Sequence, residues 1–68
     1  MEMRQLKYFM AVAKAESYSA AATELAVAQP TLSIAVRNLE QELGVQLFYT
    51  FGRRQRLTDE GQRLLEGA

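Results

Sequence analysis

The chain has 68 residues, with eight basic and eight acidic side chains and with neither cysteine nor histidine. This composition excludes disulfides, zinc-finger sites and Cys or His nucleophiles, so we expect no enzyme activity, no metal and no cofactor in this chain. No apolar run approaches the roughly 18 residues of a membrane span, and no signal sequence is visible, so we expect a cytoplasmic protein without membrane contact.

The first helix is expected from about Arg4 to Ala15, because apolar side chains recur there at steps of three and four residues. The side chains that we expect to face the core are Met3, Leu6, Phe9, Met10 and Ala13. Lys7 and Lys14 fall outside this apolar face. The spacing therefore predicts a helix that packs one side against the rest of the domain.

A second, shorter helix is expected from Ala20 to about Ala26, with Ser19 at its N-cap. Serine suits this position because its hydroxyl accepts a hydrogen bond from a backbone N–H of the first turn. The small side chains of Ala21 and Ala22 should let a neighbouring helix approach closely.

The third helix is expected from about Pro30 to Leu43. Its core side is an apolar line at steps of four, three and four residues, made of Leu32, Val36, Leu39 and Leu43. Pro30 suits the first turn, because its missing N–H would have no intrahelical partner there. Gly44 then supplies the left-handed residue that ends the helix.

From Gln46 the pattern changes to two short extended runs, QLFYT and RQRLT, on either side of FGR at residues 51–53. This arrangement predicts a β-hairpin with glycine and arginine at its tip. Thr58 is expected to cap one more helix, whose first turn is acidic. Because Leu64 and Leu65 have little local surface to cover, we expect this helix to be cut short.

Two helices separated by three or four residues form the helix-turn-helix layout that places a recognition helix in the major groove of DNA. The side of the third helix opposite its apolar line consists of Pro30, Ser33, Ile34, Arg37, Asn38 and Gln41. These side chains suit hydrogen-bonded or apolar contact with base edges, and Ile34 suits the thymine methyl group. Gln29 and Thr31, at the helix start, are expected to reach base edges or phosphates.

The helix start and the hairpin tip both favour an anionic partner. Ala28 and Gln29 are weak N-caps, which leaves backbone N–H groups without a side-chain acceptor, at a cost of about 1 kcal/mol, and a DNA phosphate would satisfy them. Arg53 at the tip suits a narrow, electronegative minor groove. Arg54 and Arg56 are expected to alternate faces, so that at most one shares the direction of Arg53.

The expected fold class is therefore mainly α with a small β-hairpin, a winged helix-turn-helix with a three-helix core. The charges also have plainer interpretations. Arginines often keep edge strands soluble, and Arg37 alone is compatible with a solvated helix charge. Glu40 and Glu42 are interpreted as solvated surface, because no nucleophile or basic partner accompanies them.

The segments SAAATELAVAQPTLSIAVRNLEQELGVQLF and GRRQRLTDEG, preceded by RQLKYFMAVAKAES, resemble the N-terminal DNA-binding domain of LysR-type transcriptional regulators. The resemblance runs from about Met3 to Gly61. The combination of AQP, LE.ELG, LF and LT..G at these spacings is much more specific than a helix-turn-helix pattern alone. It implies a bacterial, nucleoid-associated regulator that binds double-stranded promoter DNA as a homodimer or tetramer.

The resemblance also implies a division of the chain. Residues 1–58 would form the winged helix-turn-helix DNA-binding domain, and residues 59–68 would begin a truncated linker and dimerisation helix. A small-molecule inducer would bind only to a C-terminal domain that this sequence lacks. The residues implied to bind DNA are Gln29, Pro30, Thr31, Ser33, Ile34, Arg37, Arg53 and Arg54, with the first six in the major groove and Arg53 in the minor groove.

Three positions depart from the family pattern. Ala28 stands where the family usually has serine, Ile34 where it usually has arginine, and Thr50 where a basic residue is common. We therefore expect weaker electrostatic anchoring and a different base preference, with DNA binding retained.

A second function remains open from the sequence, a winged-helix module that docks on another protein through Ile34, Tyr49 and Phe51. Salt dependence distinguishes the two, because DNA binding weakens with a log-log slope of about −0.9 per phosphate contacted and an apolar contact hardly responds. With most of the linker helix missing, we expect this chain to be a monomer or a weak dimer.

Overall fold

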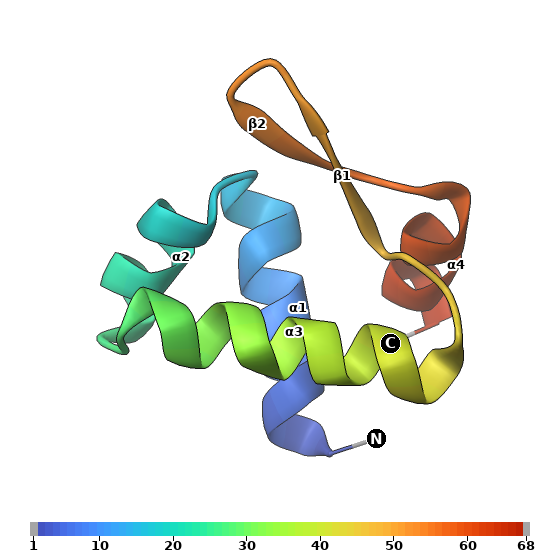
Figure 1. Cartoon of the computed structure of the whole chain (residues 1–68), viewed down its shortest axis with the longest axis horizontal. Helices are drawn as coiled ribbons and strands as arrows, with labels where there is room; N and C mark the ends of the chain where they lie inside the picture. The colour runs from blue at the N-terminus through green and yellow to red at the C-terminus, as the bar shows by residue number, and fades with distance from the viewer. Residues whose placement is uncertain (1, 68) are drawn as a thin grey trace.

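The computed structural model describes residues 2–67, which form helices and one two-stranded antiparallel hairpin. In chain order the elements are α1 (Met3–Ala15), α2 (Tyr18–Leu25), α3 (Gln29–Leu43), β1 (Phe48–Phe51), β2 (Arg54–Leu57) and α4 (Asp59–Gly67). Helix α3 crosses α1, α2 lies near the N-terminal end of α3, and the hairpin projects from the helices (Figure 1). The predicted fold class, mainly α with a small hairpin, is confirmed.

The core lies where α1, α2 and α3 meet the base of the hairpin. Its buried side chains are Phe9, Val12, Ala21, Ala22, Leu32, Val36, Leu39, Leu47 and Phe48. The Phe48 ring lies 5.4 Å from that of Phe9 and 6.1 Å from that of Tyr18, measured between centroids. Small side chains on α2 let this helix contact both α1 and α3, as the sequence predicts. None of the helices in residues 2–67 is both long and apolar enough to cross a bilayer.

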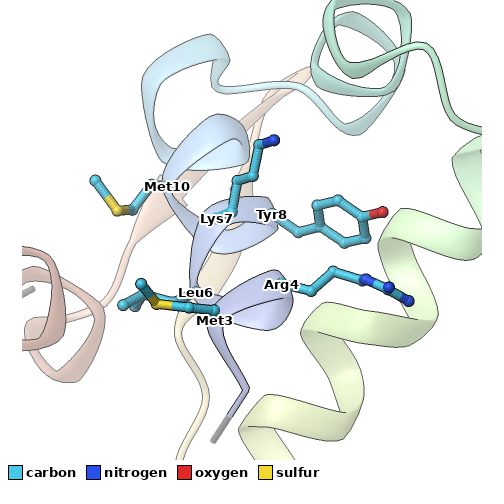
Figure 2. Close-up of a pocket in the computed structure, with 6 residues that line it drawn as sticks. All are labelled: Met3, Arg4, Leu6, Lys7, Tyr8 and Met10. Atoms are coloured by element: carbon cyan, nitrogen blue, oxygen red, sulfur yellow. The ribbon is translucent and has the colours of Figure 1, made fainter.

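The core face of α1 differs from the predicted one. Met3 is 83% exposed and Met10 is also exposed, whereas Val12, which the sequence prediction omitted, is fully buried. At about 100° per residue, Met3 and Met10 lie 100° or more from Phe9 around the helix, but Val12 lies only about 60° from it. Figure 2 shows Met3 and Met10 on the side of α1 away from Tyr8.

Helix α2 begins two residues earlier than predicted. Its N-cap is Ser17, whose hydroxyl accepts a hydrogen bond from the backbone N of Ala20 at 3.1 Å. Ser19, the predicted cap, lies inside the helix and its side chain turns toward α3. The earlier start places Tyr18 in the first turn, where its ring contacts Phe48.

Helix α3 starts one residue before the predicted Pro30 and ends as predicted at Leu43. Gly44 is left-handed, with φ of 71°, and its N–H donates to the carbonyl oxygen of Glu40 at 2.8 Å. Leu43 was predicted to be a core residue and is exposed instead. The last turn of α3 extends beyond the point where the helix crosses α1 (Figure 1).

The hairpin pairs Phe48 with Leu57 at its base and Phe51 with Arg54 beside its turn. Phe51 therefore belongs to β1, and the turn consists of Gly52 and Arg53 alone. Gly52 has φ of 63°, a left-handed conformation that glycine adopts without strain. The hairpin is present where the sequence predicts it, with a tighter tip.

Helix α4 begins as predicted after Thr58, whose Oγ1 accepts from the backbone N of Gly61 at 3.0 Å. The same hydroxyl donates to the carbonyl oxygen of Gln46 at 2.6 Å. Leu64 and Leu65 are partly buried against the core, so the expectation that they have little surface to cover is wrong. Helix α4 folds back against the body of the domain, which supplies that surface.

Candidate nucleic-acid interface

The outer face of α3 consists of Pro30, Ser33, Ile34, Arg37, Asn38 and Gln41. All of these residues are exposed except Ser33, which is half-buried. Ile34 keeps 53% of its surface in contact with solvent although its apolar side chain gains nothing from exposure. No carboxylate occurs in α3 before Glu40. The predicted division of α3 into a core side and an outer side is confirmed.

The first turn of α3 has no side-chain cap. Ala28 occupies the N-cap with extended backbone dihedrals, and its methyl group cannot accept a hydrogen bond. Pro30 stands in the first turn, where it removes one of the N–H groups that would lack a partner. The remaining N–H groups and the helix dipole give this end of α3 a partial positive charge. The weak cap predicted from the sequence is thus present in the structure.

Helices α2 and α3 are joined by a side-chain hydrogen bond at the start of α3. The Ser19 hydroxyl donates to Oε1 of Gln29 at 3.0 Å. This bond restricts the Gln29 amide and leaves its NH₂ group free to donate, and the oxygen keeps a second lone pair. Sequence reasoning missed this role of Ser19, because the two residues lie ten positions apart and their spacing carries no signal.

Ser33 also has an internal partner, since its hydroxyl donates to the carbonyl oxygen of Pro30 at 3.2 Å. The hydroxyl oxygen still has lone pairs available to accept a hydrogen bond. Ser33 therefore offers an acceptor on the outer face of α3 at little cost in rearrangement.

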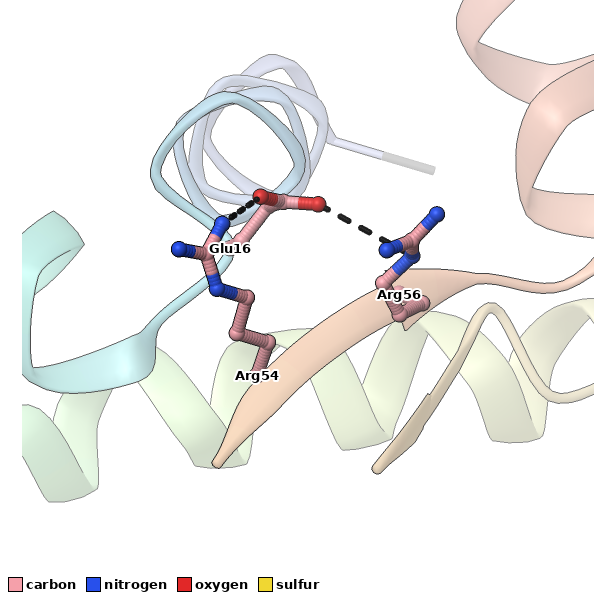
Figure 3. Close-up of polar contacts among 3 residues, drawn as sticks. All are labelled: Glu16, Arg54 and Arg56. Carbon is pink, nitrogen blue, oxygen red and sulfur yellow. Dashed lines mark hydrogen bonds and ion pairs between the residues drawn. The ribbon is translucent and has the colours of Figure 1, made fainter. Parts of the chain in front are cut away.

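The three arginines of the hairpin do not share one environment. Arg53 lies exposed in the turn, and no hydrogen bond or ion pair of its side chain occurs within residues 2–67. Arg54 and Arg56 both approach the carboxylate of Glu16 at the end of α1 (Figure 3). The expectation that they face opposite sides is wrong, because residues two apart in a strand point to the same face.

Glu40 is not the solvated surface residue that the sequence suggests. It is half-buried, and its Oε2 accepts a hydrogen bond from the backbone N of Leu47 at 2.7 Å. The carboxylate thereby anchors the segment between α3 and the hairpin.

Burial raises the pKa of the Tyr18 phenol to about 12, with a further rise from Glu40 and an opposing effect of Arg37. Tyr18 is therefore a neutral hydroxyl at physiological pH.

On the hairpin, Thr50 stands opposite Gln55, and its Oγ1 accepts a hydrogen bond from the Gln55 amide at 3.0 Å. This pair is neutral at a position for which the family resemblance implies a cation. The positive charge of the hairpin is therefore confined to its tip and to β2.

Helix α2, the following turn and α3, together with the projecting hairpin, define a winged helix-turn-helix domain. The chain belongs to the lysR family of bacterial regulatory helix-turn-helix proteins, because the model of that family matches residues 3–62. The resemblance in the sequence is thereby confirmed.

Curated relatives support this assignment. The chain is 48% identical over 61 residues to the HTH-type transcriptional regulator BenM of Acinetobacter baylyi, a match that covers 90% of this chain and 20% of that protein. It is 44% identical over 64 residues to the RuBisCO operon transcriptional regulator of Allochromatium vinosum, covering 94% of this chain and 21% of that protein. The chain thus spans about a fifth of the length of these relatives.

Solved structures share the fold closely. The BenM DBD in complex with catB site 1 DNA matches with a TM-score of 0.94 and 43% identity, over 98% of this chain and 74% of that chain. The CbnR DBD in complex with DNA matches with a TM-score of 0.93 and 46% identity, over 98% of this chain and 77% of that chain.

Proposed function

We propose that this chain is a sequence-specific, double-stranded-DNA-binding domain of a bacterial transcriptional regulator. Helix α3 enters the major groove, and Arg53 of the hairpin enters the minor groove. The observation that carries this proposal is the carboxylate-free outer face of the first half of α3, in a fold that matches the BenM DBD, a domain solved with DNA.

The outer face of α3 supplies the chemistry that base recognition needs. The Gln29 amide donates and accepts, which suits adenine, and Ile34 offers an apolar surface to a thymine methyl group. Arg37 suits guanine or a phosphate. Thr31 and Pro30 lie at the helix start, where backbone N–H groups and the helix dipole attract a phosphate.

In the wing, we assign the groove contact to Arg53. Its guanidinium is exposed at the tip and is the group best matched to a narrow, electronegative minor groove. Arg54 was also predicted from the sequence to bind DNA. Its ion pair with Glu16 competes with that role, so we assign the groove contact to Arg53 in preference to Arg54.

We propose residues 1–58 as the DNA-binding domain and residues 59–68 as the beginning of a linker helix through which the full protein forms a homodimer or tetramer. The start of α4 at Asp59 supports this boundary. Exposed Met3 and Met10 support self-association, because exposed apolar side chains gain free energy when a second chain covers them.

For the whole protein we propose regulation rather than catalysis, carried out on DNA in the cytoplasm. A small-molecule inducer would act through a C-terminal domain beyond these residues. The length of the curated relatives, about five times that of this chain, leaves room for such a domain. We assign no cofactor to the DNA-binding domain itself.

Salt titration tests the proposal. Fluorescence anisotropy with a duplex selected from random sequences should give a log-log slope of about −0.9 for each phosphate contacted. Arg53→Ala should weaken binding to selected and scrambled duplexes alike and make the salt slope shallower, because it removes a cation held between the two phosphate backbones. Binding that is weak, equal on both duplexes and insensitive to salt would contradict the proposal and would favour docking on a protein.

A further inference from the structure

Glu16 connects the end of α1 to the second strand of the hairpin. Its Oε1 lies 3.0 Å from Nη1 of Arg54, and its Oε2 lies 3.9 Å from Nε of Arg56. Its backbone carbonyl oxygen accepts a hydrogen bond from the backbone N of Gln55 at 2.9 Å. Three consecutive residues of β2 are therefore held by one residue of the helical body, as Figure 3 shows for the two guanidinium groups.

The backbone of Glu16 is left-handed, with φ of 56° and ψ of 28°, at the C-cap of α1. Glycine adopts this conformation without strain and would keep the backbone hydrogen bond to Gln55. Glutamate adds only its side chain at this position. The function of the residue therefore lies in its carboxylate.

Stability does not explain this carboxylate. The side chains of Arg54, Arg56 and Glu16 are 69%, 51% and 34% exposed, and ion pairs in such surroundings contribute little to folding. The ion pairs instead draw two guanidinium groups toward the end of α1, and the carboxylate offsets part of the positive charge of the hairpin. Arg53 directly precedes Arg54 but lies in the turn, outside this cluster, and no carboxylate offsets its charge within residues 2–67.

We propose that Glu16 is a positioning residue of the DNA-binding surface. It holds Arg54 and Arg56 away from phosphates, so that Arg53 is the arginine of the hairpin that contacts DNA. Fewer phosphate contacts lower the affinity for every duplex and leave a larger share of the binding free energy to base contacts of α3. This inference rests on the proposed function.

The test compares Glu16→Gly and Glu16→Gln with Glu66→Gln, which makes the same charge change on α4. Binding to selected and scrambled duplexes is measured by anisotropy between 50 and 200 mM salt. For each arginine released by a Glu16 change, the salt slope should steepen by about 0.9, which adds about 3.5-fold to the affinity lost across this range. The preference for the selected duplex should fall. Glu66→Gln should leave the slope unchanged.

Arg54→Gln completes the design in both backgrounds. In the wild-type chain it should leave the slope unchanged, and in the Glu16→Gly chain it should return the slope by about 0.9 toward the wild-type value. Thermal unfolding of each variant shows that it is folded, which we expect for Glu16→Gly because the backbone conformation suits glycine.

The outcomes separate the two proposals. If the wild-type chain binds DNA and the Glu16 variants match Glu66→Gln, the positioning role is overturned and the proposed function stands. If Arg54→Gln reduces the slope in the wild-type chain, Arg54 contacts phosphate despite Glu16, and the positioning role is again overturned. If the wild-type chain shows neither a salt slope nor a preference between duplexes, both proposals fall.

Discussion

The two sides of α3 carry different properties of the domain although their residues alternate along the chain. Leu32, Val36 and Leu39 are fully buried against α1, α2 and the base of the hairpin. Ser33 and Ile34 lie between them in sequence, and their surfaces reach solvent. Because of the helical geometry, the residues that stabilise the fold and those that we propose for recognition lie about half a turn apart around α3. A substitution on one side should alter stability with little effect on specificity, and a substitution on the other side should do the reverse.

The largest effect is expected on the buried side. Leu39→Ala should lower the free energy of unfolding by about 2–5 kcal/mol, because it removes buried methyl groups and leaves a cavity in a thin core. Urea denaturation followed by circular dichroism measures this loss. Without denaturant, the fraction that remains folded should keep the base preference of the wild-type chain. A changed preference would show that the buried side of α3 also affects specificity.

On the exposed side, Gln29→Ala should reduce discrimination at one base pair by about 1–3 kcal/mol. The change removes both the amide and its hydrogen bond to Ser19. Competition binding with duplexes that differ at single positions measures the effect, and Ser19→Ala serves as the control that removes the hydrogen bond alone. Equal losses on selected and scrambled duplexes would show that Gln29 does not read a base.

At the border between the two sides, Ala28→Ser should raise the free energy of unfolding by about 1 kcal/mol. The extended backbone at residue 28 suits an N-cap, and a serine hydroxyl there accepts from the first turn, as Ser17 does for α2. Thermal denaturation against Ala28→Gly measures the gain. A midpoint no higher than that of the wild-type chain would mean that the first turn of α3 is already satisfied.

The smallest change in stability is expected for Ile34→Ala, within about 0.5 kcal/mol, because more than half of the side chain is exposed. Binding should nevertheless weaken on duplexes with a thymine at the contacted position, through loss of contact with its methyl group. Replacing that thymine by uracil, which lacks the methyl group, should erase the difference between the variant and the wild-type chain. If the variant and the wild-type chain still differ on the uracil duplex, Ile34 does not contact the methyl group.

Local patterns predicted most of the fold. Gly44, Thr58 and the Gly52 turn occur where the sequence indicates them, because each end of an element is determined by a residue beside it. The predictions were wrong where contacts with other elements determine whether a side chain is buried. Met3 and Met10 fit the helical spacing, but only the position of the neighbouring elements determines which flank of α1 is covered.

The outer face of α3 was predictable from the spacing of its apolar residues, because burial of one side determines the other. The contacts of Glu16 and Ser19 were not. Glu16 and Arg54 are separated by 38 positions, and a single sequence contains nothing that pairs them. The arginines in the sequence therefore predict an anionic partner. They do not show which arginine is free to bind it and which is paired within the domain.

The junction between the hairpin and α4 contains no free hinge. The Thr58 hydroxyl bonds to both Gln46 and Gly61, and the Thr58 N–H donates to the carbonyl oxygen of Leu47 at 3.0 Å. Gly61 packs so closely on that carbonyl group that even a β-carbon would collide with it. A rotation of α4 relative to the base of the hairpin would therefore have to break these hydrogen bonds or displace the Leu47 carbonyl group.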